Sequence, residues 1–320
     1  MQHLKYLVLI ATITFIASCD KYDLQGFFVS PSKERINERF EQSIAYNKKH
    51  QEDTLIIANS DEYQFCAAAD FHVKTTANTL SRYVKLTANT PSILFSSILG
   101  DITDQKGGLA IAFDSINNNK GNSIIRILAG NHDLYFNQWH EYHQLFGSST
   151  YFFIVKTPNT SDLFIALEST TGSLGKLQKE WLENILLEKR NQHRYCIILT
   201  HTNFFDTELS QFPSGNFSLE ETAFLTNLFS KHNVDIIING HDHTYDYTEL
   251  NGVEYLTLED AQDSDSNPTY FSINVTNKEI TYQKEALWIT HWKLLNSVQD
   301  VVPNSSTSTT NAVDTAQIAT

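Results

Sequence analysis

The residues of this sequence best suited to chemistry are His, Asp and Asn side chains that occur in five short clusters. In chain order the clusters are Asp70 with His72, Asp101 with Asp104, Asn131 with His132 and Asp133, His201 alone, and His241 with Asp242 and His243. Imidazoles and carboxylates together suit Zn, Mn, Fe or Co, whereas a set of thiolates would indicate structural zinc. So many donors exceed the needs of one tetrahedral ion and fit two ions that share a carboxylate. Two metal ions that share a ligand in this way stabilise the attacking and leaving oxygens of a phosphoryl displacement.

Each cluster comes directly after an apolar run of the kind that forms a buried β-strand. Two examples are RILA at 126–129 and DIIIN at 235–239. In an open α/β sheet, side chains just beyond the carboxyl ends of the strands line the ligand crevice. A turn is the alternative for any single cluster, because Gly, Asn and Asp are common turn formers. Five such clusters, each at the end of a strand, favour one functional site.

The pattern of apolar residues predicts the elements that carry these clusters. We predict strands at 63–69, 92–99, 124–129, 151–157, 163–168, 194–200, 234–239, 253–258, 269–275 and 279–284. We predict helices at 33–49, 76–88, 105–118, 175–190 and 219–232. Strands that alternate with helices indicate an α/β fold, and the closely spaced later strands indicate β-hairpins that complete it.

The five clusters resemble the motifs of the calcineurin-like metallophosphoesterase superfamily, which are D-x-H, G-D-x-x-D, G-N-H-D/E, a lone His and G-H-x-H. The resemblance covers roughly residues 55–285 and includes the helix in GSLGKLQKEWLENIL. It implies a four-layer αββα sandwich, in which two mixed sheets lie face to face with helices outside. It also implies a dinuclear metal centre. One metal would be held by Asp70, His72, Asp101 and His243, and the other by Asp101, Asn131, His201 and His241, so that Asp101 bridges them.

The same resemblance implies a hydrolase of phosphoric esters, either monoesters or diesters. Its cofactors would be two divalent ions, chosen among Mn, Fe and Zn, and its nucleophile a bridging water or hydroxide. His132 would face the substrate, where it stabilises a phosphoryl oxygen or protonates the leaving alkoxide. Asp133 would orient His132 through a carboxylate–imidazole hydrogen bond, and the alternative is a solvated turn residue. Asp104 is assigned a supporting part in its motif.

The chain departs from the family after the lone His, where H-x-P is common and HTNFF stands here. The family's shape for the substrate-side loop 202–217 therefore does not carry over. His140 and His143 have the helical spacing of a metal pair, but a surface or packing role is the preferred interpretation. Two other functions stay open: a non-catalytic lipid-anchored binding module, and a nucleotidase without the usual second domain. About 75 residues follow His243, which leaves little room for such a domain.

The composition limits the partners of the protein. With 37 acidic and 23 basic residues, the chain has a formal charge of −14 at pH 7, which argues against a general nucleic-acid surface. A small phosphate ester is the expected substrate, bound where positive charge is concentrated locally, and we expect a monomer. Cys66 and Cys196 lie in apolar stretches, where we expect free, buried thiols rather than a disulfide.

The first residues have the pattern of an exported bacterial lipoprotein. A basic start precedes an apolar run at 6–16, which is too short to span a membrane. The following IASC resembles the lipobox, in which the Cys becomes the lipidated first residue of the mature protein. We therefore predict a signal peptide at 1–18, a lipid anchor at Cys19, a spacer and helix at 19–54, a catalytic domain at 55–290 and a disordered tail at 291–320. The alternative is an ordinary cleaved signal with an incidental Cys. The predicted location is the periplasmic or outer face of an envelope membrane.

Cys19→Ser is expected to move the protein from the membrane fraction to the soluble fraction. The reason is that acyl chains anchor a protein through their buried methylene groups, which the serine variant would not acquire. Fractionation of cells that express either form measures the effect, and Cys66→Ser is the matched control because the lipobox does not include it. A Cys19→Ser protein that stays in the membrane fraction would contradict the anchor.

Overall fold

The computed structural model describes residues 33–50, 54–56, 60–205 and 216–288. All its helices and strands belong to one unit, which ends at Leu287. The predicted signal peptide, the lipid anchor at Cys19 and the tail at 291–320 lie outside the described residues. No helix among the described residues has the length and apolar character needed to cross a membrane.

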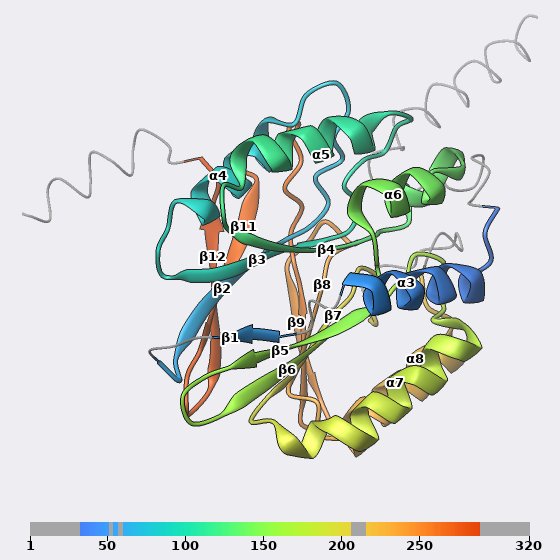
Figure 1. Cartoon of the computed structure of the whole chain (residues 1–320), viewed down its shortest axis with the longest axis vertical. Coiled ribbons are helices and arrows are strands. Elements are labelled where there is room, and N and C mark those ends of the chain that lie inside the picture. The colour runs from blue at the N-terminus through green and yellow to red at the C-terminus, as the bar shows by residue number, and fades with distance from the viewer. Residues whose placement is uncertain (1–32, 51–53, 57–59, 206–215, 289–320) are drawn as a thin grey trace, which may run out of the picture. The chain divides into compact units, whose positions relative to one another are not determined.

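Two mixed β-sheets form the centre of this unit (Figure 1). The seven-stranded sheet has the order β1 (Thr54–Ile56), β5 (Tyr151–Lys156), β6 (Ser161–Ala166), β7 (Cys196–Leu199), β8 (Ile236–Asn239), β10 (Val253–Thr257) and β9 (Asp246–Leu250). The five-stranded sheet has the order β12 (Ile280–Ala286), β11 (Thr269–Val275), β2 (Tyr63–Ala68), β3 (Ile93–Leu99) and β4 (Ile124–Leu128). Strands β2, β3 and β4 are parallel, and so are β6, β7, β8 and β10. Their carboxyl ends therefore gather at one edge of each sheet.

Helices cover the outer face of each sheet (Figure 1). On the five-stranded sheet lie α4 (Asn78–Ala88), α5 (Gly108–Asn119) and α6 (Trp139–Phe146), and on the seven-stranded sheet lie α7 (Gly175–Lys189) and α8 (Leu219–Lys231). An apolar cluster also lies between the sheets. In it, the stacked rings of Phe65 and Phe95 pack against the stacked rings of Phe153 and Phe164. Apolar side chains on both faces of each sheet thus produce four layers, which confirms the predicted α/β sandwich.

Helix α3 (Ile36–His50), the first helix of the described residues, is fixed to this core by a buried ion pair. Nε and Nη2 of Arg39 each donate to a different carboxylate oxygen of Glu168, both at 3.2 Å. Both side chains are almost fully buried. Two parallel N–H···O bonds match the planar guanidinium to the carboxylate, which offsets part of the cost of removing both charges from water.

The predicted elements are confirmed with small shifts in their ends. Two strands and one α-helix were not predicted, and neither were the short 3-10 helices His132–Asn137 and Arg190–Gln192. Strand β9 has an exposed and mostly polar sequence, DYTEL, because it is an edge strand. Strand β1 has only three residues, and α6 only eight, so neither produces a long periodic signal. Strand β6 begins two residues before the predicted start, because its antiparallel pairing with β5 includes the polar Ser161 and Asp162.

The two cysteines of the described region are free and buried, as expected. Cys66 lies in β2 and Cys196 in β7, so they belong to different sheets. Burial raises the pKa of each thiol to about 12, which keeps both groups protonated and unreactive at neutral pH.

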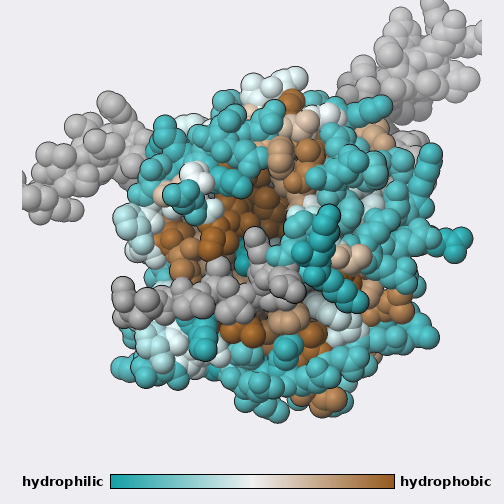
Figure 2. All heavy atoms as spheres, in the orientation of Figure 1, coloured by the Kyte–Doolittle hydropathy of each residue, from teal (hydrophilic) through white to brown (hydrophobic). Residues whose placement is uncertain are grey.

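The surface on the side shown in Figure 2 is largely hydrophilic, with hydrophobic residues gathered in a hollow.

Candidate metal centre

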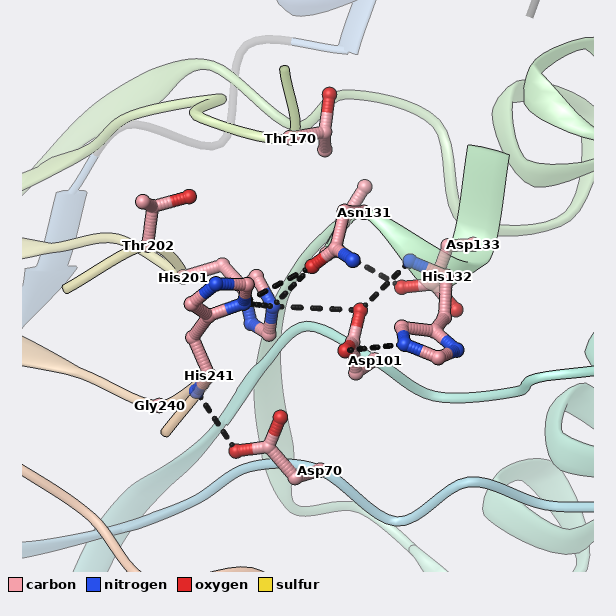
Figure 3. A network of polar contacts seen from close by, with 12 residues as sticks. Asp70, Asp101, Asn131, His132, Asp133, Thr170, His201, Thr202, Gly240 and His241 are labelled. Atoms are coloured by element: carbon pink, nitrogen blue, oxygen red, sulfur yellow. Dashed lines mark hydrogen bonds and ion pairs between the residues drawn. The ribbon is translucent and has the colours of Figure 1, made fainter. Parts of the chain in front are cut away.

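The structure brings the seven predicted metal ligands together at the carboxyl ends of five strands. They follow β2, β3 and β4 of one sheet and β7 and β8 of the other. In that order the residues are Asp70 and His72, Asp101, Asn131, His201, and His241 and His243. The close-up in Figure 3 shows that side chains from both sheets point toward one another around Asp101. Two sets of parallel strands, packed face to face, thus place their polar ends in one site.

The backbone at this site is strained. Five non-glycine residues have positive φ angles: Asp70 (57°), His72 (46°), Asp101 (48°), His241 (82°) and His243 (57°). All five are predicted ligands that come shortly after a strand. The left-handed region is uncommon for residues with a Cβ atom, and such strain concentrates at functional sites, where the surrounding structure maintains it.

The glycines of two motifs allow the ligand loops to approach one another closely. A Cβ atom on Gly130 would lie 2.1 Å from Oδ1 of Asp101. A Cβ atom on Gly240 would lie 2.4 Å from Cβ of Ala69 and 2.5 Å from Oδ2 of Asp70. Any side chain at these positions would therefore displace a predicted metal ligand. The glycines of G-N-H-D and G-H-D-H are explained by contacts between loops from different strands.

A first group of donors contains Asp70, His72, Asp101 and His243, which offer atoms within 4.8 Å of one another. Nε2 of His72 lies 3.0 Å from Nε2 of His243, which in turn lies 3.6 Å from Oδ1 of Asp70. That carboxylate oxygen is buried and has no hydrogen-bond partner among the described residues. A buried oxygen of this kind is costly unless something binds it, and a cation between these four side chains would do so.

A second group contains Asp101, His201 and His241. Oδ1 of Asn131 lies 3.0 Å from Nε2 of His201 and 3.0 Å from Nδ1 of His241, so the amide joins this group (Figure 3). Its Nδ2 donates to the hydroxyl of Tyr135, which turns the oxygen toward the imidazoles. Nδ1 of His201 donates to the carbonyl of Leu99, so its Nε2 is left as the donor atom toward the group.

Asp101 is common to both groups, and its two carboxylate oxygens face different sides. Oδ1 lies 3.3 Å from Nε2 of His201, in the second group. Oδ2 lies 3.9 Å from Nε2 of His72, in the first group. This is the arrangement that a carboxylate needs in order to bridge two ions.

The electrostatics of the site favour an ionised Asp101, a protonated His201 and three neutral imidazoles. Burial lowers the pKa of His72 well below its usual range, that of His241 to about 3 and that of His243 to about 4. Burial alone would raise the pKa of Asp101, but the imidazoles around it, His201 first, hold it well below its usual range. Burial alone would likewise lower the pKa of His201, but Asp101 raises it to about 10. A cation would take the place of that proton, and the other three imidazoles already have a free lone pair.

His132 lies beside both groups and belongs to neither. Its backbone amide donates to Oδ1 of Asp101 at 2.9 Å, and its Nε2 lies 3.8 Å from Oδ2 of the same carboxylate. The ring makes an edge contact with His72, with 4.7 Å between the centroids. This position agrees with the prediction that His132 faces a substrate rather than a metal, although the role itself stays a prediction.

The expected contact between Asp133 and the ring of His132 is wrong. Oδ1 of Asp133 accepts from the amide of Thr103, and Oδ2 accepts from the amide of Gly130. The side chain is fully buried, so it is not a solvated turn residue either. Burial and the charge of Asp101 raise the pKa of Asp133 to about 7, although the backbone amides oppose this. Asp133 therefore joins the loops after β3 and β4 and does not aim the imidazole directly.

Three other predictions concern residues near the motifs. Asp104 forms an ion pair with the exposed Lys74 at 3.2 Å, so it joins the first two motif loops. His143 stacks on Trp139 and its Nδ1 contacts the carbonyl of Gly147, which confirms a packing role. His140 is exposed on α6, and neither histidine belongs to a donor group of the described residues.

The sequence patterns missed three residues that contact the candidate ligands or their motif. Asn203 stands where the family often has Pro, and its amide donates to Asp242 between the two histidines of G-H-D-H. Asp260 lies 4.0 Å from Nδ1 of His243, and Asn216 lies 2.6 Å from Nε2 of His241. Asp260 follows strand β10 closely, so the rule that polar residues after strands line the site would have found it. Asn216 has no comparable signal.

The comparison with protein families decides what this site belongs to. The model of the calcineurin-like phosphoesterases matches residues 63–245, which is more than half of the chain and contains all seven candidate ligands. The chain belongs to the calcineurin-like phosphoesterase family. The four-layer fold and the residues of the two donor groups are therefore those of this family, and the polar residues do not lie together by chance. A comparison of the sequence with curated proteins found no match.

Two solved structures with the same fold are distant in sequence from this family member. Purple acid phosphatase PPD1 of yellow lupin (Lupinus luteus) is 13% identical with a TM-score of 0.55, and the match covers 72% of this chain and 52% of the lupin chain. GAP50, the anchor in the inner membrane complex of Plasmodium, is 14% identical with a TM-score of 0.53, and the match covers 71% of this chain and 85% of that one. At such identities the likeness shows the fold alone.

Proposed function

We propose that this calcineurin-like phosphoesterase is a hydrolase of phosphoric esters that uses two divalent metal ions. The observation that carries the proposal is the carboxylate of Asp101, whose two oxygens each face one of the two donor groups. The groups offer imidazole, carboxylate and amide donors and contain no thiolate, a set that suits Mn, Fe or Zn. When bound, two such ions would make a water molecule acidic enough to attack phosphorus and would neutralise the charge on the phosphoryl oxygens.

The chain's own residues supply positioning and a proton. Asp101 and the loops around Gly130 and Gly240 set the separation of the two donor groups. His132 holds its ring beside Asp101 and outside both groups, where its imidazole would contact a phosphoryl oxygen or the leaving alkoxide. In a chain with a formal charge of −14, the ions would also be the local positive charge that an anionic ester needs.

The proposal extends to where the enzyme works. We propose that lipidated Cys19 anchors a monomeric catalytic domain to an envelope membrane, outside the cytoplasm. There it would act on small phosphate esters. The support is the sequence pattern of the first 19 residues, which the Cys19→Ser fractionation tests.

A binding module on the same fold is the second candidate. It is favoured by the likeness to GAP50, which is described as an anchor. The observation against it is the complete donor set with its strained backbone, because a site without a metal would gain nothing from five residues at positive φ.

The test is hydrolysis of an aryl phosphate and a bis-aryl phosphodiester by purified protein, first stripped with a chelator and then given Mn²⁺. We expect no turnover after stripping and recovery when Mn²⁺ is added, and the ratio of the two rates assigns the monoester or diester class. Elemental analysis accompanies each assay. Protein that holds two equivalents of metal and hydrolyses neither ester would overturn the enzyme in favour of the binding module.

A further inference from the structure

We infer that Asn216 fixes the tautomer of His241 and thereby sets which ring nitrogen this histidine offers to a metal. The inference rests on the metal site of the proposed function and adds a positioning residue that lies outside every motif. Asn216 stands just before helix α8, two residues ahead of its N-cap Ser218.

The two ring nitrogens of His241 have different surroundings. Nδ1 lies 3.0 Å from Oδ1 of Asn131 and 3.3 Å from Nε2 of His201, so it faces the second donor group. Nε2 lies 2.6 Å from Oδ1 of Asn216, on the side away from that group. A neutral imidazole has one N–H and one lone pair, and which nitrogen has the hydrogen depends on the partners of both.

The oxygen of Asn216 accepts a hydrogen bond and cannot donate one. Oδ1 of Asn131 is likewise an acceptor beside Nδ1, but it lies at 3.0 Å, against 2.6 Å for Asn216. The shorter contact holds the hydrogen on Nε2, and the lone pair is left on Nδ1, toward Asp101 and His201. In His201 the two ring nitrogens have exchanged roles: Nδ1 donates to the carbonyl of Leu99, and Nε2 faces the second donor group. Both histidines of the second group thus have an oxygen acceptor on the nitrogen that points away from it.

Asn216 is well placed to maintain this contact because the helix that follows it is rigidly held. The hydroxyl of Ser218 accepts from the amide of Glu221, which caps α8. The carboxylate of Glu221 accepts from the amide of Leu174 and pairs with Lys179 at 2.7 Å, which joins α8 to α7. The start of α8 is therefore fixed against the start of α7.

Without this acceptor, His241 would be free to adopt the other tautomer, which directs an N–H at the cation. The ring would also lose a restraint on its orientation, while its backbone stays tied to Oδ2 of Asp70. Partners of this kind, which hold a ligand rather than the metal, are worth roughly 10- to 100-fold in metal affinity. The loss should fall on the second group, because Asn216 has no contact of this kind with the first.

The experiment compares Asn216→Leu, Asn216→Asp and the control Asn227→Leu, an exposed asparagine on α8. Titration of stripped protein with Mn²⁺ measures binding of the two equivalents separately. We expect Asn216→Leu to weaken one equivalent by about 10- to 100-fold and leave the other unchanged. Asn216→Asp keeps an oxygen acceptor and should bind both equivalents like the wild type, as should Asn227→Leu.

Nitrogen-15 NMR of the imidazoles in the metal-free protein gives a second measurement that needs neither metal nor activity. We expect the Nε2–H tautomer for His241 in the wild type and a shift toward Nδ1–H in Asn216→Leu, where Oδ1 of Asn131 still accepts beside Nδ1. An Nδ1–H tautomer in the wild type would overturn the inference. Wild-type Mn²⁺ affinity in Asn216→Leu would overturn it as well. So would a loss of affinity in Asn216→Asp that is as large as the loss in Asn216→Leu. A protein with the expected tautomer and metal profile but no esterase activity would contradict the proposed function alone.

Discussion

His132→Ala is expected to lower kcat by roughly 10²–10⁴-fold, the usual worth of a general acid. Metal content should not change, because the ring of His132 belongs to neither donor group. Its Nε2 nevertheless lies 3.8 Å from the carboxylate of Asp101, close enough to reach a substrate bound between the groups. Steady-state kinetics with elemental analysis of the same preparation measure both quantities.

The leaving group separates the two possible roles of His132. If the imidazole protonates the leaving oxygen, the loss should be large for an alkyl ester and small for a nitrophenyl ester, whose leaving group needs no proton. If the imidazole stabilises a phosphoryl oxygen, both esters should lose activity equally. His140→Ala, which removes an exposed imidazole on α6, is the matched control. Unchanged kcat in a metal-replete His132→Ala protein would refute either role.

Asp101→Asn is expected to reduce bound metal in both donor groups at once. The substitution removes the only carboxylate that the two groups share and replaces a charged oxygen with a neutral amide. We expect the metal affinity of both donor groups to fall by more than roughly 10- to 100-fold, which is the usual loss when a residue that only holds a ligand in place is mutated. Metal titration and elemental analysis measure the loss, and turnover should fall with it.

The fold of this variant should survive, because Oδ1 of an asparagine at position 101 still accepts from the amide of His132, as Asp101 does. Circular dichroism checks this. Asp104→Asn is the matched control in the same motif: its carboxylate pairs with exposed Lys74, and both equivalents of metal should remain. Two full equivalents of metal in Asp101→Asn would contradict the bridging assignment.

The strand-end clusters were predictable because neighbouring parallel strands all have their carboxyl ends at the same edge of the sheet. Asp70, Asp101 and Asn131 follow three neighbouring parallel strands, so short-range patterns were sufficient to place them in one site. His201 is the weakest of these signals, since a lone His after a strand is common, and its place depended on the order of the other clusters. The ligand and catalytic roles of all these residues stay predictions until metal is measured.

The contacts of Asp133 and Asn216 were not predictable in the same way. Asp133 was expected to orient the ring of His132 through a hydrogen bond, as carboxylates beside a functional imidazole do. In the structure its carboxylate is directed at backbone amides of 103 and 130, because those loops leave two buried N–H groups to satisfy. Asn216 has no apolar run or motif around it, and its contact with His241 spans 25 residues of sequence.

The amino-acid sequence by itself determined the types of donor, their position after strands and the α/β alternation that supports them, because these follow from local periodicity and side-chain chemistry. Only the tertiary structure decided which oxygen of Asp101 faces which histidines, which ring nitrogen of His241 faces the site, and which partners hold the loops. Those outcomes depend on how two sheets pack across a shared core. Such packing joins residues more than a hundred positions apart, such as His201 and the carbonyl of Leu99, through contacts that leave no mark in a local pattern.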